Sequence, residues 1–190
     1  MKRALGLFLA AFGLASAGSP QGPARVPCYI QYDLTVKILA FDRRLPARVG
    51  EELVLGIVFQ GDFPASLQVM TEMEQAYKIS PVKKVGAIPV RTAAVDIGRS
   101  PRWEEELKMA GVDIVYLAPL KEPAFNRMIA LCRRLRLTTI ASLPEYPFRG
   151  AAVGFEPSGE KPVIVINLSA ARAEGADFSS RLLGMAKVIR

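Results

Sequence analysis

The sequence contains no histidine among its 190 residues. This absence removes the usual general base at neutral pH, the Ser-His and Cys-His nucleophile pairs, and the commonest ligand for transition metals. With only two cysteines, Cys28 and Cys132, a zinc or iron–sulfur site is not expected either. The phosphate-binding patterns G-x-G-x-x-G and G-x-x-x-x-G-K-[ST] are also missing. We therefore predict that the protein is not an enzyme and binds no cofactor.

The sequence also has few long apolar runs, and the longest lies at the N-terminus. The basic residues of MKR precede an apolar run over residues 4–15, which the small residues ASA follow. This pattern predicts a secretory signal peptide over residues 1–17, cleaved after Ala17. A membrane anchor is the alternative, but the run is shorter than the roughly 20 apolar residues that span a bilayer.

Removal of residues 1–17 leaves 173 residues and lowers the formal net charge from +7 to +5. Residues 18–28 are predicted to form a Gly/Pro-rich linker and residues 29–190 one domain, a length that can bury a real core. A mildly basic exported chain suits ordinary solubility or anionic envelope surfaces. No nucleic-acid partner is expected, because the sequence lacks a basic stripe with interleaved aromatic residues.

The two cysteines are predicted to enter an oxidising compartment, where disulfides persist. Cys132 falls on an apolar stripe with Phe125, Met128 and Leu135 at helical spacing, which favours a small buried hydrophobic residue. A disulfide between Cys28 and Cys132 stays open as an alternative, because the sequence does not show whether the two Cα atoms come within reach.

Apolar periodicity predicts strands that alternate with helices. The expected elements are a helix over 29–45, a buried strand over 53–59, a helix over 64–77, a strand over 86–95, a helix that begins at Ser100 and Pro101, a buried strand over 112–119, a helix over 121–136 and a buried strand over 137–143. Pro89 places the second of these strands at an edge or a bulge. This alternation predicts an α/β fold with a mostly parallel sheet flanked by helices.

The pattern changes after Pro147. Apolar runs over 151–156 and 162–167 are joined by PSGEK, which predicts an antiparallel hairpin. Beyond it, Asn167 is a candidate cap for a short helix over 168–174 that Gly175 ends. A closing helix is predicted from residue 177 or 179 through Val188.

In an open α/β sheet a small ligand is expected beyond the carboxyl ends of the strands. Those ends offer Gln60, Asp62 and Ser142 as candidate ligand-binding residues. Each also has a structural role available, since Asp62 can cap a helix and Ser142 can form a loop.

The hairpin and the last helix are candidates for a protein interface. A hairpin at a sheet edge has less cover than a central strand, and aromatic residues and arginine carry much of the binding energy of interfaces. We therefore predict that Phe148, Phe155 and Arg181 bind a partner. The alternative is that both phenylalanines belong to the core.

The C-terminal residues INL, AAR, Gly175 and SSRLL follow one another in a pattern that resembles the YfiR family of exported proteins. Upstream, LVLGIVFQGDF, GAIPVRTAAV and GVDIVYLAP look like the first three strands of that family. The resemblance covers roughly residues 30–190, that is, nearly the whole predicted domain.

The resemblance implies a periplasmic, Rossmann-like domain, often dimeric, that represses a membrane-bound diguanylate cyclase by binding its periplasmic part. Such a protein lowers cyclic di-GMP, opposes biofilm formation and is peripheral to the membrane only through its partner. The alternative is a small-ligand sensor or solute-binding-like domain that acts on another membrane receptor, such as a histidine kinase.

Overall fold

The computed structural model describes residues 25–159 and 161–190; the predicted signal peptide and residues 18–24 of the linker lie outside them. The elements, in chain order, are α1 (Cys28–Leu39), α2 (Leu45–Arg48), β1 (Leu53–Phe59), α3 (Pro64–Ile79), β2 (Lys84–Val85), β3 (Ile88–Asp96), α4 (Trp103–Met109), β4 (Ile114–Leu117), α5 (Glu122–Leu135), β5 (Thr138–Ala141), the 3₁₀ helix η1 (Tyr146–Arg149), β6 (Val153–Glu156), β7 (Val163–Asn167), α6 (Leu168–Ala173), α7 (Ser180–Leu183) and β8 (Lys187–Ile189). In this described part, no helix is both long and apolar enough to span a membrane.

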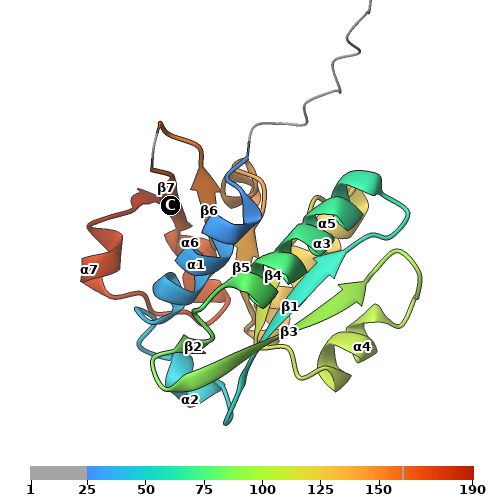
Figure 1. Ribbon diagram of the computed structural model, residues 1–190, viewed down its shortest axis with the longest axis horizontal. Coiled ribbons are helices and arrows are strands. Elements are labelled where there is room, and N and C mark those ends of the chain that lie inside the picture. The colour runs from blue at the N-terminus through green and yellow to red at the C-terminus, as the bar shows by residue number, and fades with distance from the viewer. Residues whose placement is uncertain (1–24, 160) are drawn as a thin grey trace, which may run out of the picture.

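The strands that the structure describes form one eight-stranded sheet in the order β2-β3-β1-β4-β5-β6-β7-β8 (Figure 1). The neighbours from β3 to β6 run parallel, β7 is antiparallel to β6, and β8 is parallel to β7. The predicted α/β class, with its mostly parallel sheet and antiparallel C-terminal hairpin, is confirmed. β1 is buried along its whole length because helices cover both faces of the sheet.

Alternate residues of β1 point into two separate cores. Leu53, Leu55 and Ile57 pack with α1 and α3 on one face. Val54 and Val58 pack with α4 and α5 on the other. Figure 1 shows α1 and α3 on the near side of the sheet. This division follows from the period of two in a strand, which sends successive side chains to opposite faces.

The two cysteines are both buried and free. Cys28 belongs to the core beneath α1 and α3, whereas Cys132 belongs to the core beneath α5. A disulfide between them is therefore excluded in this fold, because the sheet separates them. The prediction that Cys132 is a small buried hydrophobic residue is confirmed.

The predicted closing helix is wrong beyond Leu183. α7 spans only Ser180–Leu183, with the hydroxyl of Ser179 accepting a hydrogen bond at its start and Gly184 at its end. Residues Lys187–Ile189 instead extend as β8 beside β7. The free edge of β7 offers backbone hydrogen bonds to these residues, and pairing outweighs their helical pattern. The preceding helix was predicted correctly: the side chain of Asn167 caps α6.

Two other helix boundaries also differ from the prediction. α1 ends at Leu39 rather than near residue 45, because Asp42 forms a bridge with Phe178 and turns the chain into the short helix α2. α4 begins at Trp103, two residues later than expected, and the hydroxyl of Ser100 accepts from the N–H of Arg102 in the turn before it. Both differences arise from contacts that helical periodicity in the sequence does not predict.

The strand that contains Pro89 lies close to the sheet edge, as predicted. β3 is followed outward only by the two-residue strand β2, whose Lys84 pairs with Pro89. The parallel ladder with β1 begins at Val90, after the proline. The missing N–H of Pro89 is thus kept out of the main ladder.

Candidate functional site

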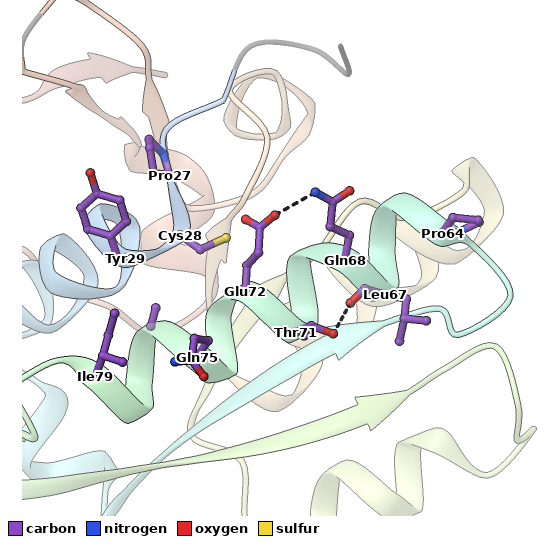
Figure 2. Close-up of a pocket in the computed structure, with 11 residues that line it drawn as sticks. Pro27, Cys28, Tyr29, Pro64, Leu67, Gln68, Thr71, Glu72, Gln75 and Ile79 are labelled. Carbon is purple, nitrogen blue, oxygen red and sulfur yellow. Dashed lines mark hydrogen bonds between the residues drawn. The ribbon is translucent and has the colours of Figure 1, made fainter. Parts of the chain in front are cut away.

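An open groove of about 670 Å³ lies between the start of α1 and the outer face of α3 (Figure 2). Its lining residues are Pro27, Cys28, Tyr29, Pro64, Leu67, Gln68, Thr71, Glu72, Gln75, Ala76 and Ile79. The lining is mainly apolar, and the volume lies within the range of small-molecule sites in proteins.

The groove has an apolar lining because α3 carries apolar residues on two faces. Val69, Met73 and Ala76 repeat at helical spacing and are buried in the core. Leu67 and Ile79 lie on the outer surface, where they are 42% and 63% exposed. A helix with one core-facing stripe normally presents polar residues outward. The outer apolar residues of α3 are therefore candidates for binding.

Tyr29 supplies a further exposed apolar side chain to this groove. It belongs to the same apolar helical repeat as Tyr32 and Val36. The structure buries Tyr32 and Val36 but leaves Tyr29 57% exposed. Tyr29 lies in the first turn of α1, which begins at Cys28, and there its side chain lines the groove.

One end of the groove holds a connected group of polar side chains. Arg25 forms an ion pair with Glu72, which also accepts a hydrogen bond from the amide of Gln68 at 2.9 Å. The other terminal nitrogen of Arg25 lies 3.1 Å from Sγ of Cys28. Burial would raise the pKa of Glu72, but the hydrogen bonds from Arg25 and Gln68 outweigh it and the pKa is lowered. The carboxylate is thus charged and already paired.

The thiol of Cys28 points toward Glu72 at the floor of the groove (Figure 2). Burial raises the pKa of this thiol, and the opposing effects of Arg25 and Tyr116 are smaller. A thiol is a poor nucleophile unless it is ionised. Cys28 therefore contributes surface and a weak hydrogen-bonding group, and it lacks the properties of a catalytic cysteine.

Behind the groove, a chain of buried polar groups reaches the carboxyl end of β5. Sγ of Cys28 lies 3.8 Å from the hydroxyl of Tyr116, which donates to the side-chain oxygen of Gln31 at 2.9 Å. The amide nitrogen of Gln31 then donates to the backbone oxygens of Val26 and Ser142. The amide of Gln31 uses both its groups, so this buried residue meets the requirement for paired polar atoms.

The predicted ligand-binding residues lie at the carboxyl edge of the sheet but do not form a joint open site. Gln60 and Asp62 both bind Lys121: Oε1 of Gln60 accepts from its backbone N–H at 2.8 Å, and Asp62 accepts from its Nζ at 2.7 Å. That hydrogen bond also lowers the pKa of Asp62. Ser142 is only 1% exposed, so it faces the interior. Ligand binding by these residues stays a prediction.

Internal hydrogen bonds use polar groups at the carboxyl edge of the sheet. The carboxylate of Asp96 accepts hydrogen bonds from the N–H groups of Gly61 and Gly98 at 3.0 and 2.9 Å. A Cβ atom at Gly61 would lie 2.4 Å from that carboxylate. The glycine at this strand-to-helix turn therefore permits a close internal contact with Asp96, a residue of another strand that local sequence patterns do not identify as its partner.

Phe155, predicted to bind a partner, is buried in the core with 1% exposure. Its side of β6 faces the core beneath α1, and the other side is covered by η1, where a Cβ atom at Gly154 would lie 2.5 Å from Pro147. The prediction failed because β8, not the hairpin, forms this edge of the sheet, and because other segments cover both faces of β6. Phe155 cannot contact a partner in this fold.

Phe148 and Arg181 are exposed, as an interface would require, but they lie apart. The ring of Phe148 lies 5.1 Å from Nζ of Lys187, whereas the guanidinium of Arg181 lies 6.0 Å from the ring of Phe41. η1 packs on the α5 face through Tyr146, and α7 packs on the opposite face through Leu182. The structure does not join the two residues into one surface.

Comparisons with known proteins place the chain by sequence and by fold. Residues 30–187 match the model of the YfiR/HmsC-like family. No curated protein matches significantly. Among solved structures, a conserved domain protein from Vibrio cholerae O1 biovar El Tor has a TM-score of 0.59 at 14% identity. An ABC domain in complex with L-Trp from Streptococcus pneumoniae has a TM-score of 0.57 at 15% identity.

Both solved structures are larger than the region they share with this protein. In each case the match covers 86% of this chain but 60% of the other. At these identities the likeness shows a common α/β fold, and it says nothing about ligands. The family match, in contrast, covers nearly all of the described residues, and the chain belongs to the YfiR/HmsC-like family.

Proposed function

We propose that this protein is an exported periplasmic regulator that binds the periplasmic part of a membrane-bound diguanylate cyclase and represses it. The observation that carries the proposal is the match to the YfiR/HmsC-like family over residues 30–187. Through its partner the protein would lower cyclic di-GMP and biofilm formation. Homodimer formation is part of the same proposal, and the protein would be peripheral to the membrane.

The side-chain chemistry is consistent with binding rather than catalysis. In the groove the ionised Glu72 is engaged by Arg25 and Gln68, and burial raises the pKa of the thiol of Cys28. Neither group is poised to transfer a proton or attack a substrate at neutral pH. Phe148 and Arg181 offer exposed aromatic and cationic side chains, which are common in the energetic centres of interfaces.

The proposal is tested by capture and reconstitution. The mature chain, residues 18–190, is immobilised and exposed to detergent-solubilised envelope, and retained membrane proteins are identified by mass spectrometry. Retention of a diguanylate cyclase with a periplasmic domain supports the proposal. The purified cyclase is then assayed with and without the chain, and a cyclase whose cyclic di-GMP production is unaffected by saturating protein contradicts it.

The groove favours a second candidate function, the sensing of a small, mainly apolar molecule on behalf of a membrane receptor. Its volume and apolar lining suit such a ligand. The fluorescent probe 8-anilinonaphthalene-1-sulfonate tests whether the groove is accessible to one. The Leu67→Gln variant should weaken probe binding, while Met109→Gln, at an 87% exposed methionine outside the groove, should not. Equal binding to both variants counts against a ligand site in the groove.

A further inference from the structure

The sheet has a weak junction between β5 and β6. These two strands are joined at a single residue pair, Ile140 with Val153. Their neighbours are joined more extensively, with four pairs between β4 and β5 and four between β6 and β7. Residues 146–189, from η1 to β8, are here called the C-terminal unit. Among the described strands, this unit meets the parallel part of the sheet only at that residue pair. Its other contacts with the rest of the chain include the bridge between Phe178 and Asp42 and the packing of Tyr146 in the core beneath α5.

Glu174, just beyond the end of α6, binds directly at this junction. Its carboxyl accepts the backbone N–H of Thr139 at 2.8 Å, in a place where β6 supplies no ladder partner. The hydroxyl of Thr139 lies 2.9 and 3.0 Å from the two carboxyl oxygens and accepts the N–H of Ala152 at 2.7 Å. One carboxyl group thereby ties together α6, β5 and the residue before β6.

The site of Glu174 is closed to water, with the residue 0% exposed. Three titratable or charged side chains face it. Arg48 of α2 donates to the backbone oxygen of Glu174 rather than to its carboxyl, and its guanidinium is paired with Asp42. From α5, Arg133 contributes a favourable charge while donating to the oxygen of Gly150.

The thiol of Cys132, also from α5, is the third of these groups. In the described residues no cation forms a salt bridge with the carboxyl of Glu174. Burial is the largest influence on the group and raises the pKa of Glu174 to about 8, against the opposing effects of Thr139, Arg133 and Arg48. The neutral acid therefore fits this site better than the carboxylate.

We propose that Glu174 is a proton-controlled latch: the neutral carboxyl holds the C-terminal unit against β5, and its ionisation opens the β5–β6 junction. Burial of a carboxylate that has no paired cation raises the free energy of the folded state, and contact with water lowers it again. Because only one residue pair joins β5 to β6, separating these two strands breaks fewer backbone hydrogen bonds than separating their neighbours, and water is expected to enter there. The latch itself is independent of the proposed function. A role for the latch in regulating partner binding through Phe148 and Arg181, which belong to this unit, does rest on the proposed function.

Hydrogen–deuterium exchange of the mature chain between pH 5 and pH 9, corrected for the intrinsic exchange rate at each pH, tests the latch. Opening should become more frequent by up to about tenfold per pH unit until the pKa of Glu174 in the folded state is reached, and then level off. We expect peptides over 138–141 and 151–156 to lose protection at least tenfold between pH 6 and pH 8. Peptides over β1 and β4 should keep theirs.

Variants distinguish opening at the β5–β6 junction from a loss of exchange protection throughout the protein. Glu174→Gln keeps an oxygen and a donor but cannot ionise, so its junction should stay protected at every pH. Glu156→Gln removes a partly exposed carboxylate of the same unit, which is paired with Lys187, and should behave like the wild type. Thr139→Val removes the hydroxyl link and should leave the junction open even at pH 6. Equal loss in all peptides, or the same pH profile in wild type and Glu174→Gln, overturns the proposal. If Glu174→Gln does not fold, the wild type still tests the proposal: the junction peptides must lose protection as the pH rises while the β1 peptides keep theirs.

Discussion

The carboxylate of Asp42 and the guanidinium of Arg48 form an ion pair in which the side chain of Asp42 has no exposed surface. Asp42 also accepts the backbone N–H groups of Arg44 and Asp177 at 3.0 and 2.9 Å. The pair therefore fastens the segment after α1 to the loop between α6 and α7, 135 residues further along the chain.

Replacement of this carboxylate should destabilise the fold. In Asp42→Asn the guanidinium of Arg48 loses its counter-ion, and removal of one partner from a buried pair typically costs about 3–5 kcal/mol. We expect a loss of about 3 kcal/mol in the free energy of unfolding, measured by urea denaturation. Asp177→Asn is the control, since its ion pair with Arg43 lies on the surface and should contribute little. Equal stability of Asp42→Asn and wild type would show that the pair is not structurally important.

Phe155→Ala tests the burial of a residue that the sequence pattern placed at an interface. Removal of a ring that is 1% exposed should lower the free energy of unfolding by about 3–5 kcal/mol, as for other buried phenylalanines. The urea denaturation midpoint measures the loss. A change below about 1 kcal/mol would mean that the ring is not a core residue.

Phe148→Ala should have the opposite profile. The side chain is 53% exposed, so its removal should leave the denaturation midpoint nearly unchanged. If Phe148 lies in the proposed interface, retention of the cyclase in the capture experiment should fall severalfold. Met109→Ala, an exposed apolar residue on another helix, is the matched control and should retain the cyclase normally. Normal retention by Phe148→Ala removes this residue from the interface.

The two thiols should differ in their rates of modification. Cys28 lines the groove, whereas Cys132 is completely buried beneath α5. Burial raises the pKa of both thiols, that of Cys132 further. We expect iodoacetamide at pH 8 to modify Cys28 slowly and Cys132 more slowly still, with both rates rising as the pH increases. Peptide mass spectrometry over a time course measures the order, and faster modification of Cys132 would contradict the assigned positions.

The raised pKa of Glu174 predicts how global stability depends on pH. The native state retains a proton that the unfolded chain has lost between the ordinary glutamate pKa and about 8. The free energy of unfolding should therefore fall as the pH rises from about 5 to about 8, by at most about 1.4 kcal/mol per pH unit, and level off above that. Urea denaturation across this range should show a smaller slope in Glu174→Gln. The same slope in both proteins would mean that another group titrates.

The sequence alone determined those elements whose burial pattern is strong and local. The continuous apolar run of β1 predicted a strand covered on both faces, and the helical stripe that contains Cys132 predicted the buried side of α5. The side chain of Asn167 caps α6 as expected. In each case the deciding interaction lies within the element or within one turn of it.

The tertiary structure decided the features that depend on distant segments. Whether Phe155 is exposed depends on α1 and η1, and whether Lys187–Ile189 pair as β8 depends on the free edge of β7. The groove at α3 arises because the start of α1 lies beside Glu72, and the closed site of Glu174 arises where β5 and β6 barely meet. Local periodicity records which side of an element is apolar. It contains no information about which distant segment covers that side, and the packing of the whole chain sets that cover.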